Sequence, residues 1–141
     1  MAAETHVRFA TEEDKDWCKS IDSRLTDDIF WFKVKHDEMI VGEIGGERVG
    51  YLRLEYWYLD LPFVGLIIVD EEHRNKGVGK VMLTFLEEHL VKSGYDVLYS
   101  SSDVGEPEPQ AWHRHMGFND CGVITGMNEN GASEVIFKKD L

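Results

Sequence analysis

The chain contains little cysteine. Its 141 residues include two cysteines, Cys18 and Cys121, which lie far apart and have no motif around them. A disulfide-stapled secreted scaffold needs several cysteines at close spacings, so the sequence excludes that class. We expect reduced thiols in a cytoplasmic protein. The length suits one domain with a substantial core, and no repeat, low-complexity tract or linker interrupts it.

Long apolar runs are missing as well. The longest is Leu61–Val69, which Pro62 and Gly65 interrupt, and it is far shorter than the roughly 20 residues of a membrane-spanning helix. The N-terminal segment Met1–His6 has neither the basic nor the apolar part of a signal peptide. We therefore expect neither a membrane partner nor secretion.

Positive charge is scarce. The formal net charge is −12, with 15 Lys and Arg against 27 Asp and Glu. Nucleic-acid binding needs clustered basic residues, so that class is disfavoured. The charge fits cationic partners, although it is also what a plain solvated surface carries. Against this acidic background three basic residues stand close together, Arg74, Lys76 and Lys80.

This basic group belongs to a glycine-bearing loop, Arg74–Gly79, between an apolar run and a helical pattern. Apolar residues recur at three- and four-residue intervals in residues 78–91, and Gly94 ends the pattern. Such a loop places backbone N–H groups at a helix N-terminus, where they can bind phosphate. Its spacing fits neither of the common nucleotide-binding glycine motifs. A plain strand-to-helix turn remains the alternative.

Periodicity and turn residues predict the other elements. The first half should contain a strand at 7–10, helices at about 11–20 and 28–35, and strands at 39–44, 48–58 and 61–69. The helix at 78–91 should be followed by a strand at 95–101, a helix at 106–116, and strands at 118–125 and 133–139. Because a helix connects them, the strands 61–69 and 95–101 should run parallel and splay apart.

Two segments resemble the GNAT superfamily of N-acetyltransferases. Arg74, Gly77 and Gly79 match its acyl-CoA loop, Arg/Gln-x-x-Gly-x-Gly/Ala, and Trp112–Phe118 resembles its second signature, a short aromatic helix ending in Gly-Phe. The resemblance implies a single three-layer α/β (α+β) domain over residues 1–141. Its central sheet should be mixed, mostly antiparallel, with about seven strands and about four helices.

The resemblance also implies acetyl-CoA as co-substrate, with no metal. The diphosphate would lie on the loop residues, and the pantetheine arm on main-chain groups of the preceding strand. These cofactor-binding residues are Ile67, Ile68, Val69, Arg74, Asn75, Lys76, Gly77, Val78, Gly79 and Lys80. The implied reaction is direct attack of an amine on the thioester, without a covalent enzyme intermediate. The alternative is a non-catalytic acyl-CoA-binding or regulatory module.

Catalytic residues follow the family pattern less closely. The family usually carries Tyr, as acid for the CoA thiolate, four residues before the Gly of Gly-Phe; here His113 stands there. Histidine can donate a proton near neutrality, or His113 packs or hydrogen-bonds while water supplies the proton. The expected strand 61–69 carries no acid, so Glu55 and Asp60 are the nearest candidates for the general base, and both also suit a surface role.

Acceptor-site candidates are aromatic. Trp57 and Tyr58 could hold a cationic amine against their ring faces, and Phe30 and Trp31 lie on the helix that borders the acceptor in this family. Packing in the core is the alternative for each. We expect the acceptor to be a small-molecule or peptide amine, drawn by the acidic surface. A homodimer remains open.

Overall fold

The computed structural model describes residues 4–141, so the first three residues of the segment considered for a signal peptide lie outside it. Seven strands form one sheet in the order β1-β2-β3-β4-β5-β7-β6. The strands are β1 Thr5–Phe9, β2 Met39–Ile44, β3 Glu47–Trp57, β4 Leu61–Val69, β5 Val97–Asp103, β6 Asn119–Ile124 and β7 Glu134–Asp140. The α-helices of the described residues are α1 Lys15–Ile21, α2 Asp27–Lys35, α3 Val78–Lys92 and α4 Pro107–His115. The predicted fold class is confirmed.

The described residues separate into two compact units. One comprises the chain as far as Leu54 together with Leu66–Leu86, and the other comprises Glu55–Gly65 with Glu87–Leu141. Each therefore contains part of β4 and part of α3. No helix of residues 4–141 is long and apolar enough to cross a membrane.

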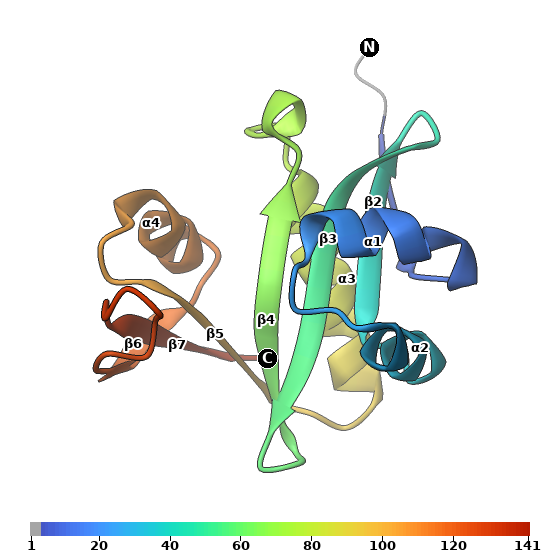
Figure 1. Ribbon diagram of the computed structural model, residues 1–141. Coiled ribbons are helices and arrows are strands. Elements are labelled where there is room, and N and C mark those ends of the chain that lie inside the picture. The colour runs from blue at the N-terminus through green and yellow to red at the C-terminus, as the bar shows by residue number, and fades with distance from the viewer. Residues whose placement is uncertain (1–3) are drawn as a thin grey trace. The chain divides into compact units, whose positions relative to one another are not determined.

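In the first unit, α1 and α2 lie on one face of β2 and β3, and the start of α3 lies on the other (Figure 1). Successive side chains along each strand point to opposite faces of the sheet. The α1 and α2 face holds an apolar core of Ala10, Cys18, Leu25, Phe30, Met39, Val41 and Tyr51. Leu66 and Ile68 of β4 pack against this core.

The α3 face depends on two glycines in neighbouring strands. Gly42 of β2 is paired with Gly50 of β3. A Cβ on Gly50 would lie 2.8 Å from Val78 and 2.9 Å from Met82, whereas one on Gly42 would lie 3.4 Å from the same side chains. The absence of a side chain at Gly50 therefore lets the first turn of α3 approach the sheet closely.

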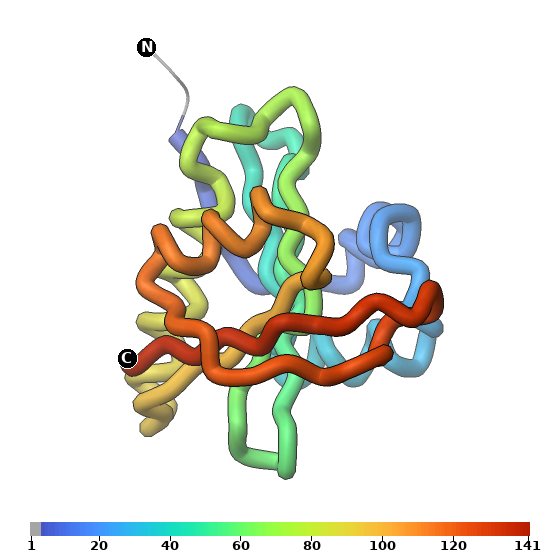
Figure 2. Tube along the Cα trace, turned by 90° about the vertical axis from the view of Figure 1, so that its left-hand side faces the viewer, coloured from blue at the N-terminus to red at the C-terminus, as the bar shows by residue number. Residues whose placement is uncertain are grey.

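In the second unit, β5 pairs antiparallel with β7, and β7 pairs antiparallel with β6. Figure 2 shows β6 and β7 side by side in orange-red and red. The start of β4 pairs parallel with β5 through Phe63 and Tyr99, which confirms the predicted orientation of these two strands. Leu98, Ser100 and Ser102 are the buried positions of β5.

Several predicted boundaries were wrong. The first strand covers Thr5–Phe9 instead of 7–10, and β5 covers Val97–Asp103 instead of 95–101. The helix expected from Thr11 begins as a separate 3₁₀ turn, Glu12–Asp14, before α1. Asp14 is buried there and accepts hydrogen bonds from the Thr11 N–H and from Arg8 and Arg48, partners in two strands that local patterns do not reveal.

Candidate functional site

The predicted loop follows β4 and leads into α3. Asp70 and a 3₁₀ turn, Glu71–His73, come first, and Arg74 is extended. Asn75 and Gly77 then adopt left-handed conformations, with φ of 62° and 82°. Asparagine tolerates this conformation and glycine adopts it without steric cost, which explains why the chain can turn so sharply here.

The loop is open on the side where a ligand would approach. A Cβ built on Gly77 would have no atom within 4 Å. Gly77 O accepts a hydrogen bond from Val81 N, 3.1 Å away, so this glycine directly precedes the helix, whose first N–H groups have no partner within it. Arg74, Lys76 and Lys80 are exposed around it. These residues fit an anionic phosphate group.

Two hydrogen bonds fix the start of the loop. Asp70 N donates to Val49 O of β3 at 2.7 Å, and Arg74 Nε donates to Val69 O at 3.1 Å. The carboxylate of Asp70 also lies 2.9 Å from His73 Nδ1. The end of β4 and the loop that follows it are therefore held by backbone contacts as well as by side chains.

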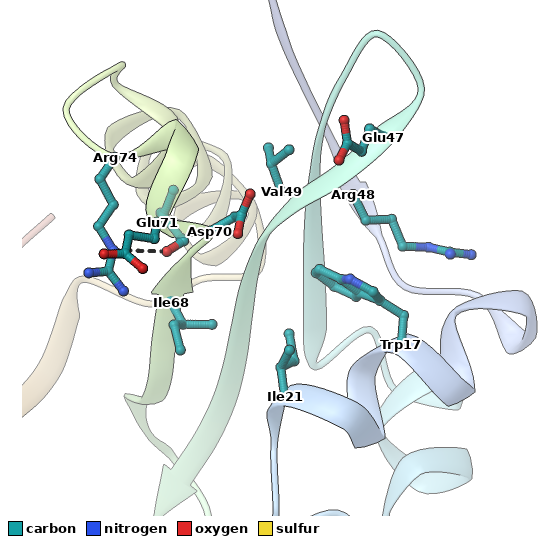
Figure 3. Close-up of a pocket in the computed structure, with 10 residues that line it drawn as sticks. Trp17, Ile21, Glu47, Arg48, Val49, Ile68, Asp70, Glu71 and Arg74 are labelled. Atoms are coloured by element: carbon teal, nitrogen blue, oxygen red, sulfur yellow. Dashed lines mark hydrogen bonds between the residues drawn. The ribbon is translucent and has the colours of Figure 1, made fainter.

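A cavity of about 370 Å³ lies beside the end of β4, on the α1 face of the first unit. Figure 3 shows Trp17 and Ile21 rising from α1 toward the strands, with Ile68 on β4. Its rim carries Glu47, Asp70 and Glu71. Of the cavity residues just named, the sequence analysis anticipated Ile68 alone. The acidic residues directly after β4 were a visible signal of a charged site there.

His113 lies in the interior of the second unit and is 3% exposed. Its Nδ1 is 2.7 Å from Pro109 O and its Nε2 is 2.7 Å from Ser100 Oγ. The ring stacks on Phe137 with centroids 4.7 Å apart. Burial lowers the pKa of His113, while the Pro109 carbonyl and the charge of Glu134 act in the opposite direction. The ring is therefore held in its neutral form.

The expected acceptor residues belong to both units. Phe30 is fully buried in the core of the first unit, whereas Trp31 is 42% exposed, with Lys15 Nζ 5.4 Å from its ring centre. Trp57 stacks on Phe63, and Tyr58 is exposed in the turn between β3 and β4. That turn precedes β4 in the chain, whereas the loop Arg74–Gly79 follows it.

The candidate general bases, Glu55 and Asp60, lie in the second unit, before β4 ends. Glu55 lies on β3 near the turn between β3 and β4, and Asp60 lies within that turn, with its N–H 3.3 Å from Trp57 O.

Ile67, Ile68 and Val69 of β4 are half-buried, at the end of the strand that meets the loop. Within residues 4–141, no cluster of His, Cys, Asp or Glu is arranged to hold a metal ion.

The profile of the Acetyltransferase (GNAT) family matches residues 6–118. The chain belongs to the GNAT acetyltransferase family. It is therefore an acyltransferase of the acetyl-CoA-dependent N-acetyltransferase class, as predicted. The matched range includes the loop Arg74–Gly79 and ends at Phe118 of the second signature. No curated protein sequence matches this GNAT chain significantly.

Solved structures share the fold of this acetyltransferase. Ard1 from Thermoplasma volcanium aligns with a TM-score of 0.84 at 13% identity, over 97% of each chain. The ribosomal-protein-S18-alanine N-acetyltransferase from Escherichia coli aligns with a TM-score of 0.79 at 16% identity, over 97% of this chain and 94% of that one. A GNAT family acetyltransferase from Elizabethkingia anophelis with acetyl-CoA bound gives 0.77 at 14% identity, over 97% and 98%. These likenesses establish the fold.

Proposed function

We propose that this protein moves an acetyl group from acetyl-CoA directly to an amine. The observation that carries the proposal is the loop at Gly77, left-handed and open, at the N-terminus of α3. Its backbone N–H groups would hold the CoA diphosphate, and Arg74, Lys76 and Lys80 would add positive charge. Main-chain groups of Ile67–Val69 would bind the pantetheine arm.

When bound, acetyl-CoA supplies a thioester whose carbonyl carbon is open to attack by an amine. The main chain near Val69 would donate a hydrogen bond to the oxygen on which negative charge develops. Thiol nucleophiles are not needed. Burial raises the pKa of the Cys18 thiol to about 12, and burial also raises that of Cys121, so neither thiol is activated as a thiolate. This supports transfer without a covalent enzyme intermediate.

Release of CoA requires a proton for the thiolate. The predicted donor was His113, but a backbone carbonyl can only accept, so the proton of the neutral ring lies on Nδ1, facing Pro109 O. Nε2 then carries a lone pair and accepts from Ser100. We therefore favour the second alternative, in which water supplies the proton and His113 joins α4 to β5.

The amine must also lose a proton before it attacks. Glu55 and Asp60 stay predictions for this role. Both belong to the second unit, whereas Val69 belongs to the first. We favour carboxylates or water near the end of β4, because Asp70 and Glu71 directly follow Val69.

The acceptor is a small-molecule or peptide amine in this proposal. Two similar structures are named as ribosomal-protein alanine N-acetyltransferases, from Escherichia coli and Brucella melitensis, which supports including peptide amines. A single acetyltransferase domain over residues 1–141, cytoplasmic location and a homodimer remain predictions.

Release of free CoA across an amine panel tests the proposal. The panel should contain alkyl diamines, lysine-like amines, a peptide with N-terminal alanine, and glutamate. We expect release that depends on the amine, with a monoacetylated product in mass spectrometry. Acetyl-CoA binding in calorimetry with no release for any amine would contradict catalysis and identify an acyl-CoA-binding module.

A further inference from the structure

The cavity beside β4 opens on the α1 face of the first unit, and of the loop residues Arg74–Gly79 its lining includes Arg74 alone. Ile68 and Leu66 pack toward α1 and α2, and the cavity is floored by Trp17, Ile21 and Ile68. The loop leads into α3, which covers the other face. A second reactant can therefore approach the end of β4 from the α1 face without displacing a phosphate bound at the loop.

The rim of this cavity carries three carboxylates. Glu47 lies at the start of β3, and Asp70 and Glu71 follow β4. Figure 3 shows the carboxylates of Glu47 and Asp70 extending toward Val49 from opposite sides. An ammonium group entering between them would meet carboxylate on both sides.

The two arginines of the lining are already engaged. Arg48 Nε donates to the buried carboxylate of Asp14 at 2.7 Å, and its Nη2 donates to Glu13 O at 3.1 Å. Figure 3 shows its guanidinium directed past Trp17, away from Val49. Arg74 donates through Nε to Val69 O. The charge of Arg48 is thus matched by Asp14, whereas that of Arg74 remains at the edge of the cavity, beside Glu71 in Figure 3.

We propose that this cavity binds the acceptor, and that it selects a small alkyl amine carrying a second ammonium group. The proposal rests on the proposed function. Its methylene chain would lie on Trp17, Ile21 and Ile68, and the ammonium groups near the rim carboxylates, with Trp17 adding a cation–π contact. The volume of about 370 Å³ suits a small molecule better than a peptide segment. This differs from the expected place near Trp57 and Tyr58.

The test compares 1,4-diaminobutane, butylamine, an alanine-initiated peptide and glutamate as acceptors, with Glu47→Gln and Glu71→Gln variants. Glu72→Gln is the matched control, because Glu72 is an exposed carboxylate of the same turn that does not line the cavity. We expect KM for diaminobutane to rise about fivefold in each cavity variant and to stay unchanged in the control. The parent's preference for the diamine should shrink as salt rises.

A second measurement separates the cavity from catalysis. Calorimetric titration of 1,4-diaminobutane into the parent and Glu47→Gln proteins, without acetyl-CoA, should show weaker binding to the variant. Glu47-dependent binding without acetylation of any amine would support the cavity and refute the proposed function. Acetylation of glutamate or the peptide in preference to the diamine, or cavity variants that behave like Glu72→Gln, would overturn the cavity while leaving acetyl transfer intact.

Discussion

The Nε2 atom of His113 lies 2.7 Å from the Oγ atom of Ser100. On the other side of the ring, Nδ1 lies 2.7 Å from Pro109 O. Since the carbonyl only accepts, Nδ1 carries the proton and Ser100 donates to Nε2. In the neutral form, both ring nitrogens have a hydrogen-bond partner. In a protonated ring, Nε2–H and the Ser100 hydroxyl would both be donors, and the hydroxyl would have to rotate before its oxygen could accept.

This pair makes stability depend on pH. Because burial lowers the folded-state pKa of His113, the unfolded chain takes up a proton first as pH falls. Its stabilising contribution is complete above the unfolded pKa of about 6.5 and is lost as pH falls through the lower folded value. The free energy of unfolding, measured with urea, should therefore decrease from about pH 7.5 to about pH 5.5.

Replacement of the ring identifies the source of this decrease. His113→Gln should lower stability at pH 7.5 but flatten its pH dependence, whereas His115→Gln, at an exposed position of α4, should retain the parent's slope. Equal slopes for the parent and His113→Gln would show that other groups cause the effect.

Activity of His113→Phe distinguishes a packing role from an acid role. We expect turnover within about fivefold of the parent and unchanged affinity for acetyl-CoA, since Nε2 carries no proton to give. His113→Tyr should also remain active, because Tyr is the usual family residue at this position. A loss of roughly 10²-fold in kcat for the Phe variant, with Tyr retaining activity, would restore His113 as the thiolate acid.

Gly77→Val should abolish measurable acetyl-CoA binding, because its side chain would occupy the space into which phosphate approaches. Gly131→Val is the matched control: Gly131 has φ of 80° against 82° for Gly77, and a Cβ at either position meets no atom within 4 Å. Both variants should lose about 1–2 kcal/mol of stability from backbone strain. Calorimetry should show loss of binding in Gly77→Val alone, and equal affinities would refute the phosphate site.

Arg74→Ala should weaken acetyl-CoA binding less than Gly77→Val does. The substitution removes a charge and the hydrogen bond to Val69 O but leaves the backbone N–H groups in place. The deficit should be largest at low ionic strength, because salt screens exposed charges. Calorimetric titrations at low and high salt measure it, and a deficit independent of salt would point to loss of loop geometry instead.

Gly50→Ala should destabilise the first unit by about 1–3 kcal/mol, as overpacking does. The new methyl would lie 2.8 Å from Val78, the first residue of α3, while Gly42→Ala places its methyl at ordinary contact distance, 3.4 Å. Urea unfolding of the two variants should separate them clearly. A similar loss in both would mean that α3 shifts to accept either methyl.

Much of the fold could be predicted from the sequence because the signals that predict it lie within short segments. Glycine at 77, basic residues around it and a helical period after it are all within a few residues of one another. The second signature from Trp112 to Phe118 is equally local. Together they predicted the family, while periodicity and turn residues predicted the element order and the connecting helix predicted the parallel pair β4 and β5. The structure and the family match confirm these predictions.

What the sequence could not determine depends on residues far apart in the chain. Phe30 and Trp31 are neighbours of the same type, yet one is fully buried and the other half-exposed, because packing against Met39 and Tyr51 decides it. The burial of His113 depends on Ser100 of β5 and Phe137 of β7, and the cavity combines α1, β3 and β4. The sequence by itself determined the loop chemistry and the order of elements; the tertiary structure decided protonation, burial and the cavity, because each requires distant segments to meet.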